Sequence, residues 1–218
     1  MTIPNSQYPG TPQTIAEIHG ALWQDVVEIC AQWQAWNALY ENARNVDVLS
    51  WAAVGFFGSL RQWLLDSVIL GVARVTDPVQ TRARVPQDNL VVERLAVECD
   101  AVGESVLAAT VRSNLAAAQP CIRKLKDHRN KRIAHSDLAH GLASAGAVLP
   151  PILGQDIEQA LNFITEAMNA VEAHFENGRT TAYDRFFEVG AAAVLVQRLQ
   201  VARDVANSER RRIGMDPE

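Results

Sequence analysis

An all-α helical bundle of five to seven helices is the fold class that this sequence predicts. Apolar residues recur every three or four positions over long stretches, which is the repeat of an amphipathic helix. No stretch alternates convincingly with a period of two, as a half-buried strand would. With 218 residues, of which 48% are hydrophobic and 21% charged, the chain can bury one substantial core. The sequence therefore predicts a single helical domain over residues 13–207.

The first two helices are predicted to be long. Three prolines mark residues 1–12 as an extended leader, and a helix follows from residue 14 to about residues 42–45. Its apolar repeat consists of Ile15, Ile18, Leu22, Val26, Ile29, Trp33, Trp36 and Tyr40. A second helix is predicted over residues 47–77, where Pro78 stops it. Because this helix is apolar around most of its circumference, we expect it at the centre of the bundle.

Shorter segments are predicted for the rest of the chain. In order, they are a polar surface loop at 78–87, helices at 89–99 and 104–119, a further helix opened by Pro120, a loop without charge at 141–154, and helices at 155–176 and about 182–207. Pro120 stands where a first-turn proline belongs. Asn177-Gly178 ends the helix predicted at 155–176. The polar tail, 208–218, is expected to fray.

The bulk properties exclude several classes of protein. A net charge of -5 argues against a nucleic-acid surface over the whole chain, although a local patch remains allowed. No apolar run approaches the ~20 residues of a membrane span, and the N-terminus has no secretory signal. Three scattered cysteines predict neither a disulfide framework nor a zinc site. We therefore expect a cytoplasmic protein with no membrane partner, no metal and no cofactor.

The densest positive charge of the chain lies in residues 123–132. This stretch holds six basic residues against the single Asp127, and all three lysines of the chain are among them. A solvated face of a helix is the simplest explanation of such a run. The position of one arginine within the run indicates something more specific.

Arg129 interrupts an apolar stripe of the predicted helix. The stripe consists of Ile122, Leu125, Arg129 and Ile133, at steps of three, four and four residues. An unpaired guanidinium is costly to bury, so we expect Arg129 to have an anionic partner or to point into a cleft. Asp66, a lone carboxylate on the apolar second helix, is the predicted partner.

A histidine follows this arginine at a specific spacing. Asn130 comes directly after Arg129, and His135 stands six residues after Arg129. An arginine followed directly by Asn, Asp or His, with a histidine six residues after it, is expected by chance roughly 0.05 times in a chain of this composition. The run RNKRIAH at 129–135 resembles the signature of HEPN domains (higher eukaryotes and prokaryotes nucleotide-binding), which are all-α bundles. VILGVARVTD at 68–77 and the run RNKRIAHSD that begins at Arg129 resemble its abortive-infection branch in particular. The resemblance covers roughly residues 13–200.

The resemblance implies a metal-independent endoribonuclease that works as a homodimer on RNA, as a toxin or antiphage effector. It assigns catalysis to the arginine and histidine of the motif, here Arg129 and His135. Histidine titrates near neutral pH and can move a proton, and the planar guanidinium suits phosphate oxygens. Asn130 could orient either partner by hydrogen bonding. Lys126, Lys131 and Arg132 are predicted to contact the RNA backbone, and a plain solvated face explains these three equally well.

Helical geometry sets a condition on this site. Six residues rotate an α-helix by ~600°, which leaves Arg129 and His135 about 120° apart and ~9 Å apart along the axis. Either the helix loosens near Ala134, or a second copy completes the site across a two-fold axis. We expect the homodimer.

Two other functions remain open from the sequence. The same bundle could be a non-catalytic module that binds a nucleotide or a protein partner. Alternatively, Arg129, His135 and Asp66 could form a purely structural network. An antitoxin protein is a candidate partner if the chain is a toxin, and the sequence identifies neither the RNA substrate nor such a partner.

Overall fold

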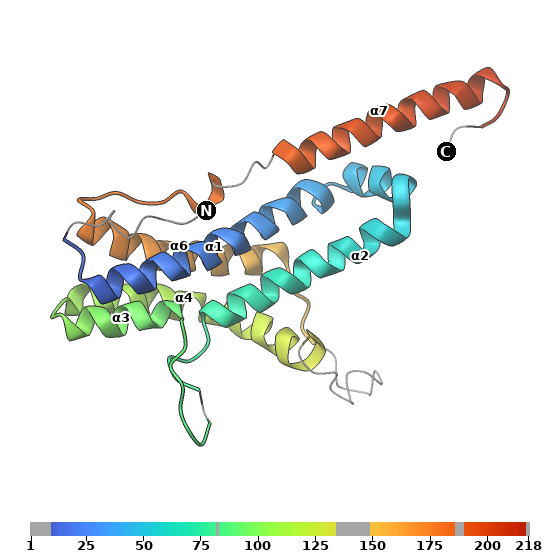
Figure 1. Cartoon of the computed structure of the whole chain (residues 1–218). Coiled ribbons are helices and arrows are strands. Elements are labelled where there is room, and N and C mark those ends of the chain that lie inside the picture. The colour runs from blue at the N-terminus through green and yellow to red at the C-terminus, as the bar shows by residue number, and fades with distance from the viewer. Residues whose placement is uncertain (1–9, 82, 134–148, 186–189, 217–218) are drawn as a thin grey trace. The chain divides into compact units, whose positions relative to one another are not determined.

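The computed structural model confirms the all-α fold class. It describes residues 10–81, 83–133, 149–185 and 190–216, and six α-helices account for most of them. These helices are α1 (Gln13–Tyr40), α2 (Ala43–Val75), α3 (Val92–Ala101), α4 (Ser105–His128), α6 (Gly154–Phe175) and α7 (Gly190–Arg212) (Figure 1). A π-helical segment, η1 (Arg129–Ile133), continues α4, and η2 (Tyr183–Arg185) is a 3₁₀ turn. In the described residues, the β-structure is limited to one isolated bridge between Gln80 and Asp88.

The chain forms two compact units, and α1 and α2 each contribute to both. The first unit contains Met1–Ile29 and Ile69–Tyr183, and the second contains Cys30–Val68 and Asp184–Glu218. The candidate motif at the end of α4 therefore belongs to the first unit. The core of this unit forms where α4 packs against α3 and α6. Its fully buried side chains include Leu95, Ile122, Leu125, Ile157, Ile164 and Met168.

A glycine allows α1 and α2 to approach closely within the first unit. A Cβ atom added at Gly71 would lie 2.5 Å from Cγ1 of Ile29, well inside van der Waals contact. Gly71 is buried, and its neighbours Ile69 and Val72 are fully buried. The close approach fixes the C-terminal part of α2, which leads directly to the candidate site.

The second unit has a small core of its own. Leu39, Tyr40, Leu49, Phe57 and Val196 are buried together, and the Tyr40 hydroxyl donates a hydrogen bond to the Phe57 carbonyl at 2.9 Å. Within this unit α2 departs from helical geometry at Ala53 (φ -167°, ψ 79°), so two helical stretches follow one another.

Several predicted boundaries were wrong, and each has a physical reason. Pro120 opens no new helix, because α4 runs unbroken through it. The ring of Pro120 is exposed, while Ala118, Cys121 and Ile122 around it are buried, so packing on both sides keeps one helix. The expected frayed tail is helical as far as Arg212, and the turn after it is closed by Gly214 (φ 79°) and by a hydrogen bond from Arg210 to the Asp216 carbonyl.

Other predictions about the elements were confirmed. The helix over 155–176 is α6, and it ends as expected at Asn177 and Gly178, which both have positive φ. The polar segment after α2 is a loop, as predicted, and it is stapled by backbone hydrogen bonds between Thr81 and Gln87 and between Val79 and Asn89. Among the described helices, none combines the length and the apolar character that crossing a membrane requires.

Candidate functional site

The motif stands at the end of α4, where the helix changes its geometry. Leu125 is fully buried against the core, and three residues later α4 passes into η1, which begins at Arg129. A π-helical turn closes i→i+5 hydrogen bonds and takes more residues than an α-helical turn. A loosened helix near Ala134 was one of the two alternatives; Ala134 lies outside the described residues, and the described helix already leaves α-helical geometry at Arg129. Single π turns occur frequently at functional sites.

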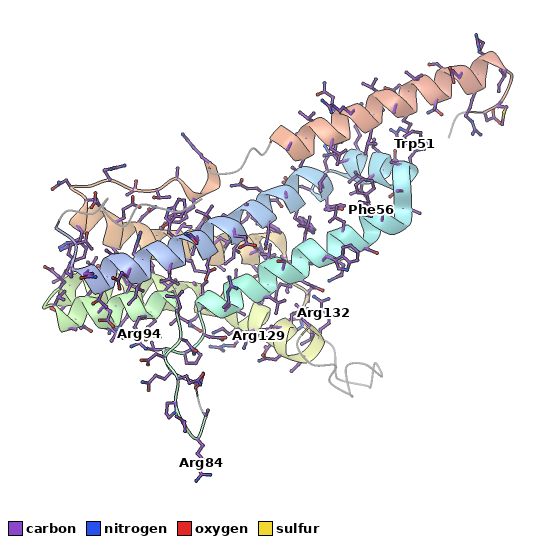
Figure 2. All side chains as sticks on the ribbon, viewed as in Figure 1. Trp51, Phe56, Arg84, Arg94, Arg129 and Arg132 are labelled. Carbon is purple, nitrogen blue, oxygen red and sulfur yellow. The ribbon has the colours of Figure 1, made fainter. Side chains whose placement is uncertain are left out.

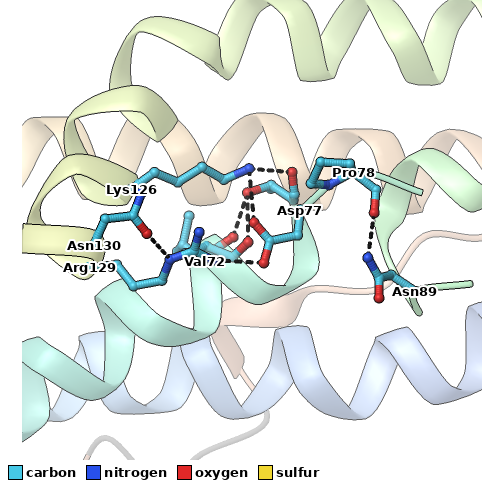
Figure 3. A network of polar contacts seen from close by, with 9 residues as sticks. Val72, Asp77, Pro78, Asn89, Lys126, Arg129 and Asn130 are labelled. Atoms are coloured by element: carbon cyan, nitrogen blue, oxygen red, sulfur yellow. Dashed lines mark hydrogen bonds and ion pairs between the residues drawn. The ribbon is translucent and has the colours of Figure 1, made fainter. Parts of the chain in front are cut away.

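Arg129 forms an ion pair with Asp77, the second residue after α2. Its Nη1 atom lies 2.7 Å from Oδ2 of Asp77, and the two side chains are 22% and 29% exposed (Figure 3). The carboxylate that meets Arg129 in the described residues is Asp77, whereas the sequence named Asp66. Asp66 belongs to the second unit, where it accepts a hydrogen bond from Gln62 at 2.7 Å.

Lys126 lies one helical turn before Arg129 and faces the same carboxylate. Its ammonium group donates to the Thr76 carbonyl at 2.6 Å and lies 3.4 Å from Oδ1 of Asp77. A cation at the end of a helix stabilises the unpaired carbonyls of the last turn. Burial lowers the pKa of Lys126, and the Asp77 carboxylate opposes this shift. Lys126 thus connects the end of α2 to α4.

Asn130 contacts the guanidinium from the other side. The Nε atom of Arg129 donates to Oδ1 of Asn130 at 3.0 Å, so Asn130 and Asp77 together hold two edges of the guanidinium plane (Figure 3). These contacts use Nε and Nη1, and the described residues make no contact with Nη2. Lys131 and Arg132, the other predicted RNA contacts, are exposed on η1, and Figure 2 shows Arg132 beyond Arg129 at this end of the helix.

Two predicted features lie outside the described residues, wholly or in part. His135 falls in the segment 134–148, and so does most of the predicted loop at 141–154. Shortly after this segment, the carbonyl oxygen of Pro150 lies 2.7 Å from Nε2 of His128 on the last turn of α4. The distance between Arg129 and His135 therefore stays a prediction.

Two further contacts brace the corner that carries Asp77. The Thr76 hydroxyl donates to the Val72 carbonyl at 2.7 Å and closes the last turn of α2. On the other side, the Asn89 side chain donates to the Pro78 carbonyl at 2.7 Å and closes the base of the following loop (Figure 3). Asp77 is therefore held by backbone that is fixed on both of its sides.

Asp77 is the site residue that sequence reasoning missed. It is the last residue of VILGVARVTD, and the helical repeat alone gives it no partner. A charged residue directly before a proline that ends an apolar helix was the available signal, because such a residue lies at the rim of the core. Two cations and one carboxylate at this corner leave one positive charge. The arrangement can therefore bind an anion, and in the described residues no cluster of three or more acidic, histidine or cysteine side chains is suited to a metal ion.

Most of the chain matches a known protein family. The sequence matches the HEPN family model described as AbiU2 over residues 12–194, which covers all of α1 to α6 and the complete motif. Comparison with curated proteins and with solved structures gives no match. The resemblance to the abortive-infection branch is thereby confirmed, and the chain belongs to the AbiU2 family of HEPN domains.

Proposed function

We propose that this protein is a metal-independent endoribonuclease of the HEPN type that acts as a homodimer, and that it serves as a toxin or antiphage effector. The observation that carries the proposal is the guanidinium of Arg129, which is held by Asp77 and Asn130 at the start of a π-helical segment within the matched family region. A positive group fixed in one orientation at the end of a helix suits a phosphodiester.

RNA carries its own nucleophile beside each phosphate, the 2′-hydroxyl. In the proposed reaction His135 accepts the proton of this hydroxyl as the 2′-oxygen bonds to phosphorus, and the bond to the 5′-oxygen breaks. The departing 5′-oxygen takes up a proton from solvent, His135 later returns its own proton to solvent, and the other product ends in a 2′,3′-cyclic phosphate. Arg129 stabilises the negative charge that builds on the phosphate oxygens, and Asn130 orients the guanidinium.

Lys131 and Arg132 are proposed to contact the RNA backbone, because both are exposed on the same short segment as Arg129. The ammonium group of Lys126 already donates a hydrogen bond to the Thr76 carbonyl. Lys126 is therefore proposed to add positive charge near the site without contacting the RNA itself. The homodimer is proposed because one helix presents a single arginine and histidine, whereas two motif segments that meet at a two-fold axis present two of each.

The test is cleavage of single-stranded RNA in excess chelator by the wild type, Arg129→Ala and His135→Ala. Wild type is expected to cut RNA and to leave a DNA strand of the same sequence intact, since DNA lacks the 2′-hydroxyl. Each variant is expected to lose at least ~100-fold in rate, as general acid–base catalysis and charge stabilisation contribute about this much each. Cleavage at the wild-type rate by either variant contradicts the proposal.

The ion pair with Asp77 also favours a second candidate, a non-catalytic module in which Arg129 ties α4 to the end of α2. In that case Arg129→Ala lowers the melting temperature, and the wild type does not cleave RNA. Arg129→Lys separates the two functions, because lysine keeps the charge for the ion pair but loses the fork that grips a phosphate.

A further inference from the structure

Asp77 stands at the one point where α2, the loop after it and the motif helix meet. Its two carboxylate oxygens face different cations: Oδ2 lies 2.7 Å from Arg129 and Oδ1 lies 3.4 Å from Lys126. We propose that Asp77 is the positioning residue of the site, which fixes the guanidinium of Arg129 so that its remaining edge faces the scissile phosphate. This inference rests on the proposed ribonuclease function.

Hydrogen bonds hold the backbone on both sides of Asp77. The Thr76 carbonyl accepts a hydrogen bond from the Lys126 ammonium group, and the Thr76 hydroxyl donates one to the Val72 carbonyl. These two hydrogen bonds close the last turn of α2. Across Pro78, the loop is closed by the Asn89 side chain. A carboxylate whose own backbone cannot shift can hold an arginine in one direction, and misplacement of a reacting group by ~1 Å can cost ~100-fold in rate.

The local charges agree with a phosphodiester as the fourth member of the cluster. Arg129 and Lys126 supply two positive charges and Asp77 supplies one negative charge, so one phosphodiester anion brings the total to zero. Without the carboxylate, the cluster would attract RNA more strongly, but the long arginine side chain would have no fixed orientation. Asp77 is therefore expected to raise the rate of cleavage without strengthening the binding of RNA.

The experiment measures cleavage and binding separately, with short single-stranded RNA as substrate and the same RNA with a 2′-deoxy nucleotide at the cut site as the binding probe. For Asp77→Asn we expect kcat to fall by ~10–100-fold, while Kd for the probe stays the same or falls. Asp77→Glu, which keeps the charge on a longer arm, is expected to recover part of the lost rate.

Two further variants serve as controls. Asp127→Asn makes the same change of charge beside Lys126 in the chain, and no contact from Asp127 to Arg129 is among the described contacts; its kcat is expected to stay within about twofold of wild type. Asn89→Ala loosens the base of the loop without any change of charge. It is expected to lower kcat by a few-fold, and it keeps the proposal testable if Asp77→Asn does not fold.

The outcomes separate the two proposals. If Arg129→Ala and His135→Ala lose cleavage while folded Asp77→Asn cuts like wild type, the positioning role of Asp77 is wrong and the ribonuclease function stands. Equal losses in Asp77→Asn and Asp127→Asn also overturn the positioning role, because they would show a general effect of charge. If wild type does not cut RNA, the proposed function itself fails. A lower melting temperature with kcat unchanged would make Asp77 merely structural.

Discussion

Asp156 is a buried carboxylate in the first turn of α6, and two donors hold its charge. The ammonium group of Lys124 lies 2.7 Å from Oδ1, and the backbone N–H of Leu153 donates to Oδ2 at 2.9 Å. Burial by itself raises the pKa of this carboxyl, but the hydrogen bonds from Lys124 and Leu153 outweigh burial and lower it. The charged carboxylate thus closes the N-terminus of α6 and connects it to α4.

We expect Asp156→Asn to lower the free energy of unfolding by about 1–3 kcal/mol at pH 7, because a buried charged acceptor is lost. A carboxyl whose pKa is lower in the folded state stabilises the fold above its unfolded pKa, near 3.8, and loses this contribution as the pH falls through the folded value. Urea unfolding at pH 7 and near pH 3 should therefore show a smaller difference between the two proteins at the lower pH. Glu158→Gln, an exposed change on the same helix, is the control and should differ little at either pH.

At the same scale, the sequence predicted the kind of partner that Arg129 needs but not its identity. An arginine in an apolar stripe needs an anionic partner or a cleft, and this argument uses only the helical repeat. Asp66 and Asp77 both lie at the edge of the apolar pattern, eleven residues apart, which is about 16 Å along a helix. Which of them meets Arg129 depends on how far α4 is shifted along α2, and tertiary packing alone sets that shift.

At the scale of elements, periodicity predicted which segments are helical, and it failed at prolines and at changes of helix type. Pro120 was expected to divide the basic helix from the one before it, but α4 continues through it. The proline removes one backbone hydrogen bond of the helix. Burial of Ala118, Cys121 and Ile122 stabilises the helix on both sides of the proline and outweighs this loss. The π-helical turn at Arg129 is equally invisible in a repeat of 3.6 residues, because a single turn is too short to shift the pattern.

The packing of α2 on α1 gives a prediction at this scale. Gly71→Ala places a Cβ within 2.5 Å of Cγ1 of Ile29, a β-branched side chain with little freedom to move. We expect a loss of about 1–3 kcal/mol in the free energy of unfolding, as overpacked cores show. Gly58→Ala lies on the same helix with nothing within 4 Å of the new Cβ, and alanine should stabilise it by about 0.5–1 kcal/mol. Denaturant unfolding of both variants measures the two free energies of unfolding. A Gly71→Ala protein as stable as Gly58→Ala would contradict the close approach of α2 to α1 at Gly71.

At the scale of the whole molecule, the proposed homodimer can be tested through its active site. Arg129→Ala and His135→Ala chains are each expected to form inactive dimers. In a mixed dimer, the Arg129→Ala subunit still supplies His135 and the other subunit still supplies Arg129. A site that combines residues of both subunits therefore regains one complete pair, whereas a site within one subunit regains none.

We expect a mixture of the two variants, refolded together or co-expressed with different tags, to recover RNA cleavage that neither variant shows alone. Random association places about half of the dimers in the mixed form, so the recovered rate should stay below half that of wild type. The matched control mixes Arg129→Ala with the double variant Arg129→Ala/His135→Ala. Neither chain of this mixture carries Arg129, so the mixture should remain inactive. If the tagged subunits co-purify as mixed dimers and still do not cleave, the residues of the site come from one subunit, and the shared cleft is wrong.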